Sequence, residues 1–275
     1  MRTISLFLCA VFMTAASNAA WYQQTNGTIV DPILDTGGGV LPYAGNNLEP
    51  GADLTGANLI DADLLDAALA NAMMSGINLS AAKMWRSDLT NTDLTGANLT
   101  GAFLFRSNMS GTDMTDAVLP NGDLQEVNLS GATLNTSDFS SVKLWYSDMT
   151  GTEIRNSNLA GAKLGNADLL GSDLTNTDLS GSKVYRTIFS YVDLSGTDLT
   201  SLEFYDDADW TNAYYYTDNE PTWDANMDAA FRSAAGIVAL APGSSPLYPV
   251  PEPNSVAILA CGILTLGLVR RRFWR

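Results

Sequence analysis

The stretch from Ala81 to Met114, "AAKMWRSDLTNTDLTGANLTGAFLFRSNMSGTDM", decides how this chain folds. Within it, a Leu, Met or close substitute returns at every fifth residue. A helix repeats every 3.6 residues and a strand every two, so neither element explains this spacing. The same spacing holds from Leu54 to Phe204, where each of the 31 positions is apolar. The chain therefore contains a long internal repeat with a period of five.

Each five-residue unit, or quintet, has further preferences around its apolar centre. Ala, Ser and Thr dominate two residues before the centre, Asp and Asn one residue before it, and Gly and Asn two residues after it. If each quintet forms one side of a square coil, the centre and the small residue point inward. Gly and Asn then lie at the corners, where a tight turn needs positive φ. Leu119-Pro120-Asn121 has the chemistry of such a type II turn.

Four quintets make a coil of twenty residues, and successive coils are expected to stack like parallel strands about 4.8 Å apart. A disordered tract of low complexity would not require an apolar residue at every fifth position. Quintets of the form A-(D/N)-L-x-x resemble those of pentapeptide-repeat proteins, and the resemblance covers residues 52–206. It implies an all-β fold, a right-handed quadrilateral parallel β-helix. The departures are local: Lys takes the Asp/Asn place at Lys83, Lys143, Lys163 and Lys183, and Gly122 replaces a small inward residue.

The spacing slips by one residue at both boundaries of the repeat. Leu48 lies six residues before Leu54, and Trp210 lies six after Phe204. We assign residues 48–217 to the β-helix and residues 20–47, which mix apolar residues with Gly and Pro, to an N-terminal cap. A cap is expected because the end of a solenoid exposes apolar surface that must be covered.

Residues 218–238 are predicted to form a C-terminal cap that contains a short helix. Within "DANMDAAFRSAAGIV", Asp224 or Asn226 would begin the helix and Gly236 would end it. The helical spacing places four apolar residues on one face: Met227, Ala230, Phe231 and Ala234.

The first nineteen residues have the layout of a signal peptide. Arg2 precedes an apolar stretch from Ile4 to Met13, and small residues follow up to an expected cleavage site after Ala19. A buried N-terminal helix is the alternative interpretation. These features predict that the protein is exported.

At the other end, residues 239–250 read as a Pro/Ser linker and residues 251–275 as an apolar segment with a basic tail. The apolar run from Val256 to Val269 would span about 21 Å as a helix, short of the roughly 30 Å hydrocarbon core unless flanking residues extend it. The basic end is expected to stay cytoplasmic.

Pro251, Glu252 and Pro253 directly before this segment resemble the PEP-CTERM sorting signal. The resemblance implies a partner, a membrane protease of the exosortase type, that cuts near these residues. The protein would be anchored transiently in the inner membrane by its C-terminus and then reach the cell surface or the extracellular space. A permanent single-span anchor is the alternative.

Composition excludes several classes of function. The chain carries 30 acidic and 14 basic residues, a formal charge of -16, which disfavours binding to nucleic acid. It has no histidine, and Cys9 and Cys261 lie in the terminal apolar segments. This argues against disulfides, Cys/His zinc sites, and Ser-His or Cys-His catalysis in the body of the protein. We expect no cofactor, no catalytic residue and no metal site.

Calcium binding between stacked carboxylates is an alternative to the absence of a metal site. Asp148 would lie over Asp168, and Asp173 over Asp193, and such carboxylates repel each other unless they are hydrogen-bonded or bridged. The period of five already explains these columns, however, and it differs from the nonapeptide repeat of calcium-binding β-helices.

Positions twenty residues apart share one face of the predicted rod. The face centred on residues 84, 104, 124, 144, 164, 184 and 204 carries seven of the eight basic residues between 82 and 206, and seven of the eight outward aromatic residues, Tyr205 included. Four acidic residues interrupt it: Asp123, Glu126, Glu203 and Asp206. We call this surface the aromatic-basic face. Its candidate binding residues are Lys83, Trp85, Arg86, Phe103, Phe105, Arg106, Lys143, Trp145, Tyr146, Lys163, Lys183, Tyr185 and Arg186.

The face has two interpretations. Its rings and cations could simply stack on one another along the rod, or they could form a contact surface, because aromatic residues and Arg are enriched in interfaces. The second reading predicts an exported, non-catalytic structural or adhesive scaffold that binds an exopolysaccharide or a surface protein.

Two other functions remain open. A polysaccharide-active β-helix enzyme is one, although active sites on solenoids usually need long loops and none leaves this repeat. A DNA-mimic type of binding protein, as the resemblance to cytosolic pentapeptide-repeat proteins implies, is the other, and the predicted export argues against it.

Overall fold

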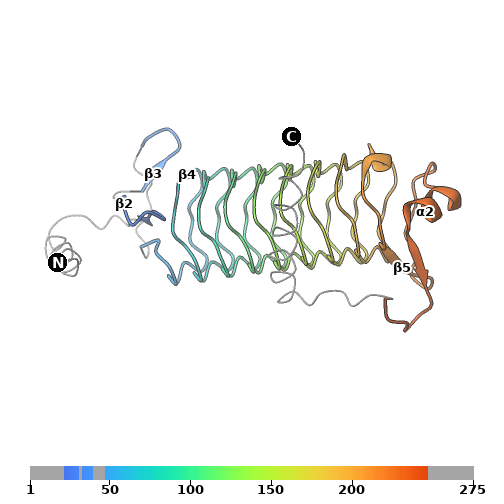
Figure 1. Cartoon of the computed structure of the whole chain (residues 1–275). Coiled ribbons are helices and arrows are strands. Elements are labelled where there is room, and N and C mark those ends of the chain that lie inside the picture. Colours follow the sequence, from blue (N-terminus) through green and yellow to red (C-terminus); the bar gives the residue numbers. More distant parts are fainter. Residues whose placement is uncertain (1–21, 31–32, 40–46, 247–275) are drawn as a thin grey trace, which may run out of the picture.

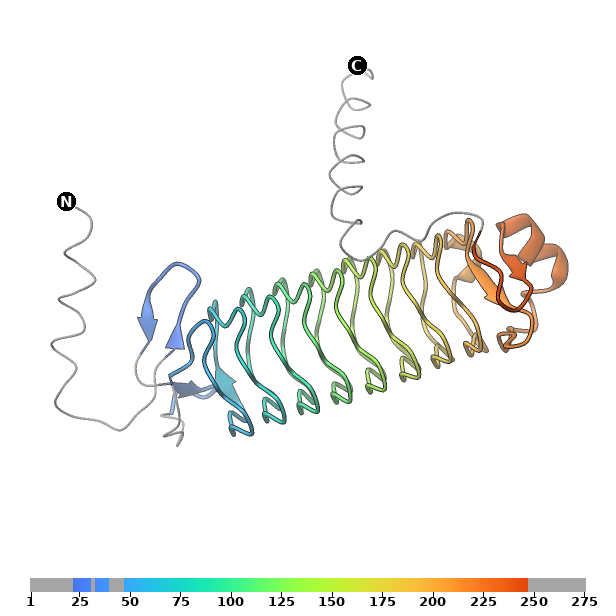
Figure 2. The ribbon, with the colours of Figure 1, turned by 90° about the horizontal axis from the view of Figure 1, so that it is seen from below.

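The computed structural model describes residues 22–30, 33–39 and 47–246. The predicted signal peptide and the predicted sorting signal lie outside these residues. Within the described part, successive coils stack side by side into an elongated rod (Figures 1 and 2). None of the helices in this part is long and apolar enough to cross a membrane.

Neighbouring coils pair in parallel at a distance of twenty residues, as the sequence predicts. On one face, Lys83 pairs with Phe103 and Phe103 with Asp123, and this pattern continues along the rod. Each side of a coil pairs through a single residue, the one before the apolar centre, because a corner follows two residues later. Regular strands are therefore short, although the stacking is continuous.

The interior of the rod consists of the apolar centres and the small residues two positions before them. Leu104 and Ala102 are both fully buried, and the centres from Leu54 to Leu199 are all buried. Where Ser or Thr takes the small position, its hydroxyl still finds an acceptor: Ser107 donates to the carbonyl of Met84 on the preceding coil at 2.6 Å. No buried side-chain nitrogen or oxygen in the described residues lacks a partner.

The corners have the predicted backbone geometry. Gly101 has φ 66° and Asn121 has φ 62°, and positive φ extends to residues that rarely adopt it, such as Ala81. The Asp/Asn preference one residue before the centre also has a physical cause. The carboxylate of Asp93 accepts hydrogen bonds from the backbone N–H and the hydroxyl of Thr95, at 3.0 and 2.6 Å, and so stabilises the corner that follows.

Short strands cover the N-terminal end of the rod. Strand β1 (Tyr22–Gln23) pairs with β2 (Ile29–Val30), and β3 (Leu34–Asp35) pairs with β4 (Ala62–Asp63), both antiparallel. Figure 1 shows β2 and β3 at this end. The side chains of Tyr22, Ile33 and Leu48 are buried there.

The regular repeat ends one quintet earlier than predicted. Ile188 pairs with Asp209, a separation of twenty-one residues, so one residue is inserted between Phe204 and Trp210. Phe204, predicted to point inward, is 50% exposed, with φ 64°. Tyr205, predicted to point outward, packs against the core and contacts the ring of Phe231 at 5.1 Å. Both expectations were wrong because a slip of one residue reverses the side to which each side chain points.

After this insertion Asp193 pairs with Tyr214, again twenty-one residues on, and three further residues are inserted before Thr222, which pairs with Asp198. Residues Tyr205–Asp207 form the 3-10 helix η1, and Trp210 is then buried with its ring stacked on Phe189 at 4.3 Å. The six-residue spacing between Phe204 and Trp210 is therefore the sequence signal of the insertion.

Helix α2 (Ala229–Ala235) begins later than predicted. Asp228 is the N-cap, and its carboxylate accepts a hydrogen bond from the backbone N–H three residues on. Asp224, one of the two predicted starts, instead accepts a hydrogen bond from the backbone N–H of Asn226 at 2.9 Å in the preceding turn. Gly236 ends the helix in the left-handed conformation, with φ 81°, as predicted.

The buried face of the helix also differs from the expected one. Met227 is fully buried, and Phe231 and Ala235 pack against the core. Ala230 and Ala234, which we expected on this face, are exposed.

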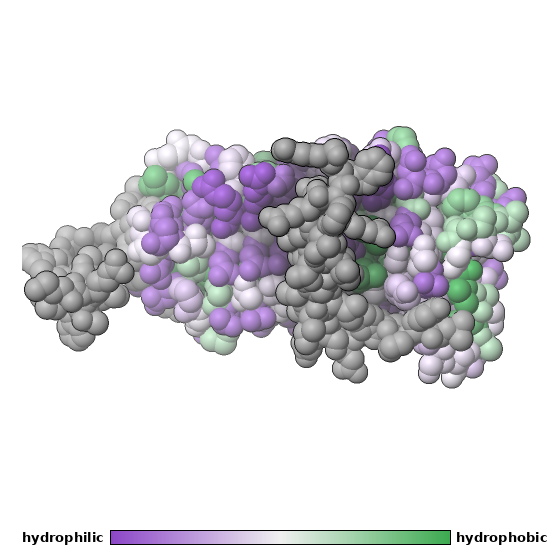
Figure 3. All heavy atoms as spheres, viewed as in Figure 1, coloured by the Kyte–Doolittle hydropathy of each residue, from purple (hydrophilic) through white to green (hydrophobic). Residues whose placement is uncertain are grey.

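The C-terminal cap extends into the predicted linker. Strand β5 (Tyr214–Tyr216) pairs in parallel with β6 (Val238–Leu240), and Leu240 is buried. Ala239 and Leu240 therefore belong to the folded end of the rod. In Figure 3, hydrophilic residues cover most of the visible side and apolar residues are concentrated toward this end.

Candidate binding face

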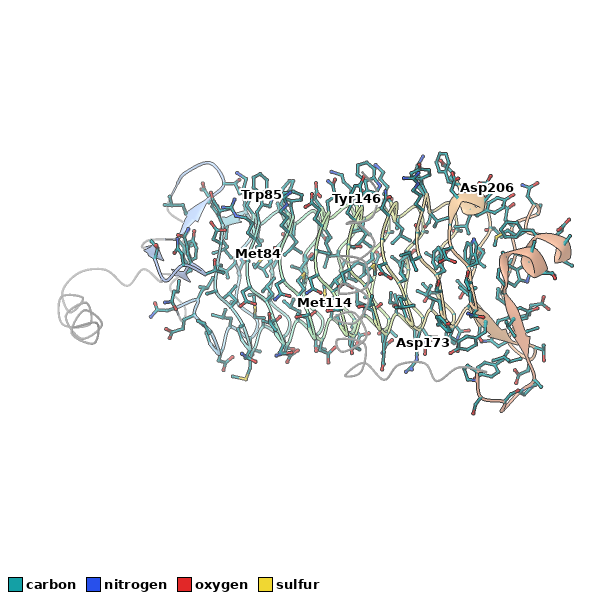
Figure 4. The ribbon with its side chains drawn as sticks, viewed as in Figure 1. Met84, Trp85, Met114, Tyr146, Asp173 and Asp206 are labelled. Carbon is teal, nitrogen blue, oxygen red and sulfur yellow. The ribbon has the colours of Figure 1, made fainter. Side chains whose placement is uncertain are left out.

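The structure gathers the predicted face residues on one side of the rod. Lys143, Lys163 and Lys183 pair in parallel through their backbones on three successive coils. Figure 4 places Trp85 and Tyr146 on the same long edge of the molecule. The twenty-residue rule thus places these side chains correctly.

Most rings of this face are exposed, and the rings contact cations more than they contact one another. Tyr146 is 64% exposed, and Trp85, Trp145 and Tyr185 are between 38% and 41% exposed. Three rings have a cation above them: Arg106 over Phe105 at 4.8 Å, Lys163 over Trp145 at 5.8 Å, and Arg186 over Tyr185 at 5.2 Å. Within the described residues, one ring pair forms on the face, between Tyr185 and Phe204 at 6.2 Å. Phe204 is thus a member of the face that the sequence analysis missed.

Ion pairs between neighbouring coils neutralise part of the face. The Arg86 guanidinium binds both carboxylate oxygens of Asp66 at 2.7 Å, and these hydrogen bonds lower the pKa of Asp66. Such exposed pairs contribute little to stability, because water screens the charges. The other pairs on the face are Arg106 with Glu126 at 2.7 Å, Lys143 with Asp123 at 3.1 Å, and Lys183 with Glu203 at 2.6 Å. The acidic residues that appeared to interrupt the face are therefore mostly partners of its cations.

Three cations of the face differ from these four. Lys83 donates a hydrogen bond to the carbonyl of Thr36 at 3.5 Å and so contacts the N-terminal cap. Lys163 and Arg186 form no ion pair within the described part of the chain, and each lies near an aromatic ring instead. Arg155, the basic residue between 82 and 206 that lies outside the face, pairs with Asp173 at 2.6 Å and Glu153 at 3.3 Å.

The stacked Asp residues of the other faces mainly hold their own corners. Asp168 and Asp193 accept hydrogen bonds from the backbone N–H two residues on, at 3.0 and 2.9 Å. Burial raises the pKa of Asp168, and the carboxylate of Asp148 adds to the rise. Burial likewise raises the pKa of Asp193. Across residues 22–30, 33–39 and 47–246, no group of three or more His, Cys, Asp or Glu side chains could hold a metal ion.

A shallow pocket of about 350 Å³ lies at the C-terminal end of the rod. It was not foreseen, because the last coils meet there with residues that follow β6. The Tyr216 hydroxyl donates to the carbonyl of Ser244 at 3.2 Å, and Ser195 donates to Asp193 at 2.6 Å, so these polar groups are already paired. The lining residues are Thr175, Asp193, Ser195, Tyr216, Asp218, Asn219, Pro242 and Gly243.

Comparison with known proteins identifies the family. A family model described as pentapeptide repeats (8 copies) matches residues 50–86, 74–111, 86–121, 106–135, 123–156 and 152–190. These segments cover just over half of the chain, which therefore belongs to the pentapeptide-repeat family. Members of this family adopt a right-handed quadrilateral β-helix. A search of curated proteins gives no match.

Several solved structures are similar. HetL, a pentapeptide repeat protein involved in heterocyst differentiation regulation from the cyanobacterium Nostoc sp. strain PCC 7120, is 25% identical over 72% of this chain and 88% of its own, with a TM-score of 0.31. A trypsin-treated form of QnrB1, a plasmid-mediated fluoroquinolone resistance protein, is 19% identical over 60% of this chain and 83% of its own, with a TM-score of 0.33. A pentapeptide repeat protein from the Arabidopsis thaliana thylakoid lumen is 24% identical over 48% of this chain and 63% of its own, with a TM-score of 0.20.

Proposed function

We propose that this protein is an exported, non-catalytic scaffold whose rod presents the aromatic-basic face to an extracellular polymer or a partner protein. The observation that supports this most is the concentration of exposed rings and cations on one side of an otherwise acidic rod. Backbone pairing between coils fixes the spacing of these side chains before any ligand arrives, which lowers the entropic cost of binding. Rings and Arg side chains also have the composition of protein interfaces.

A non-catalytic role is favoured by the chemistry of the rod. The chain has no histidine, and neither cysteine lies in the repeat. Lys143 and Lys183 on the face are engaged by carboxylates of neighbouring coils, as structural charges are. Release of soluble fragments from a polymer by the purified protein would contradict this part of the proposal and favour the enzyme alternative.

Export is proposed from the two terminal segments. Cleavage after Ala19 and near Pro251 would release residues 20–250 to the cell surface or the medium, after transient anchoring in the inner membrane and processing by an exosortase-type protease. Mass spectrometry of the protein from fractionated cells tests this. We expect both termini to be missing from an extracellular form, and an intact chain in the cytoplasmic fraction would refute it.

The binding role is tested by pull-down of the polymer and proteins from the surface of the producing cell. We expect the native protein to retain material that the double variant Trp85→Ala/Trp145→Ala loses. A matched control is Ile60→Ala/Val118→Ala, which removes two exposed apolar side chains, 42% and 40% exposed, that lie outside the face. Equal retention by all three proteins would show that the face is not a binding surface.

A further inference from the structure

Three successive coils of the face carry cations and no carboxylate at their outward positions. The lysines at 143, 163 and 183 form one column in which neighbouring backbones pair directly. Adjacent coils lie about 4.8 Å apart, and like charges directly opposite each other destabilise a pair of strands. This column is therefore unfavourable unless negative charge comes from elsewhere.

Carboxylates on neighbouring coils neutralise the two outer lysines of the column. Lys143 reaches Asp123 on the preceding coil, and Lys183 reaches Glu203 on the following one. Lys163, between them, forms no ion pair among the described residues and lies 5.8 Å from the ring of Trp145. Arg186, on the last of the three coils, also has an aromatic ring rather than a carboxylate beside it. The middle of the column keeps an uncompensated positive charge.

Two exposed rings flank this charge along the rod. The backbones of residues 145, 165 and 185 stack, because Tyr146 N–H bonds to the carbonyl of Gly165 at 3.1 Å and Asn166 N–H bonds to that of Tyr185 at 2.8 Å. The backbones of Trp145 and Tyr185 are thus two coils apart, roughly 9.5 Å, and the Trp145 ring leans toward the residue between them. The middle position is a glycine, so no side chain from that position stands between the two rings.

We propose that the three-coil patch of Lys143, Trp145, Tyr146, Lys163, Lys183, Tyr185 and Arg186 binds a linear acidic polysaccharide, a chain of uronic acid rings that runs along the rod. This inference rests on the proposed function and specifies its ligand. The carboxylates of the sugar rings pair with Lys163 and Arg186. The C–H faces of the rings pack against the aromatic side chains.

The spacing of the rod favours this ligand. A pyranose ring with its glycosidic oxygen advances an extended chain by roughly 5 Å, as single bonds of about 1.5 Å require. One coil advances the rod by about 4.8 Å, so the polymer meets one coil per sugar ring. An extended acidic peptide advances about 3.4 Å per residue, so its residues do not match the spacing of the coils. A second copy of the rod would have the same coil spacing. Its stacked carboxylates, such as those of Asp168 and Asp193, however, already accept hydrogen bonds from the backbone of their own corners.

The test uses the mature protein and an oligomer of galacturonic acid, with the methyl-esterified oligomer as a probe of the same shape without charge. We expect calorimetry to detect binding of the acidic oligomer and to show that the ester binds at least about tenfold more weakly. Added salt should weaken the complex with the acidic oligomer. Equal binding of the two probes, or no binding of the acid, would overturn the assignment.

Variants then locate the site. Lys163→Gln and Trp145→Ala should each weaken binding of the acid by about tenfold or more. Arg155→Gln and Val118→Ala are controls, because they remove a cation and an exposed apolar side chain that lie outside the face, and they should bind as the native protein does. Equal losses in both pairs would overturn the location. Thermal melting of each variant identifies any loss of fold.

Sedimentation separates this proposal from self-association. If the native protein dimerises and the Lys163→Gln variant does not, the patch binds a second copy of the chain instead of a polysaccharide. That result would overturn the inference. If the acidic oligomer does not bind but the protein still retains cell-surface material in a way that requires Trp145, the proposed ligand is wrong and the proposed function stands. If neither binds, the proposed function also fails.

Discussion

Alanine substitutions at two phenylalanines of the repeat should have very different effects on stability, although the five-residue period treats them alike. Phe139 is fully buried. Its removal loses about 1.5–3 kcal/mol of transfer free energy and leaves a cavity, so Phe139→Ala should cost about 3–5 kcal/mol. Phe204 is 50% exposed, and its ring meets Tyr185 edge-on at 6.2 Å. Phe204→Ala leaves no internal cavity and should cost about 1 kcal/mol.

Urea unfolding, followed by both circular dichroism and tryptophan fluorescence, measures this difference through the transition midpoint at an unchanged slope. Phe204→Gly is an additional control, because φ at this position is 64° and glycine removes a left-handed strain of about 1–2 kcal/mol. It should be more stable than Phe204→Ala. If Phe204→Ala costs as much as Phe139→Ala, the ring lies inside the rod and the inserted residue lies elsewhere.

Three further predictions follow from the corners and the cap. Gly101→Ala and Gly196→Ala both place alanine at positive φ, but a Cβ at Gly101 meets open space whereas one at Gly196 meets Asn176. Thermal melting should therefore show a loss of folding free energy of about 1 kcal/mol for Gly101→Ala and a larger loss for Gly196→Ala. Equal losses would contradict this prediction. Asp193→Asn should raise the melting temperature at pH 7, because burial raises the pKa of this carboxyl and the folded state favours its neutral form. The gain in melting temperature should vanish below about pH 3.9, where the carboxyl is protonated in both the folded and the unfolded chain. A gain that does not depend on pH would contradict this prediction. Asp228→Ala removes the N-cap of α2 and should cost about 0.5–2 kcal/mol, seen as faster amide exchange in the cap but not in the middle of the rod.

The sequence predicts the rod well because two local rules act at every quintet. An inward position demands an apolar or small residue, and a corner demands positive φ, so Leu104 and Gly101 can be placed without any knowledge of their neighbours. The stacking then follows from counting to twenty, which also places the aromatic-basic face.

The rest depended on contacts that no local rule fixes. The inserted residue was visible as the six-residue step to Trp210, but its position was not, and so Phe204 and Tyr205 were assigned to the wrong sides. The helix began at Asp228 because Asp224 was held in a turn of its own. Both errors arise where the regular coil gives way to packing between distant residues.

The ion pairs of the face could have been anticipated, and their pattern separates structure from function. Arg86 lies one coil after Asp66, and Lys143 one coil after Asp123, as expected when stacked charges are chosen to compensate each other. Lys163 breaks this rule: both neighbours in its column are also lysines, and each turns away to its own carboxylate. Departures from local rules tend to mark functional sites. A bound anion is the physical condition under which this column stabilises the rod instead of opposing its stacking.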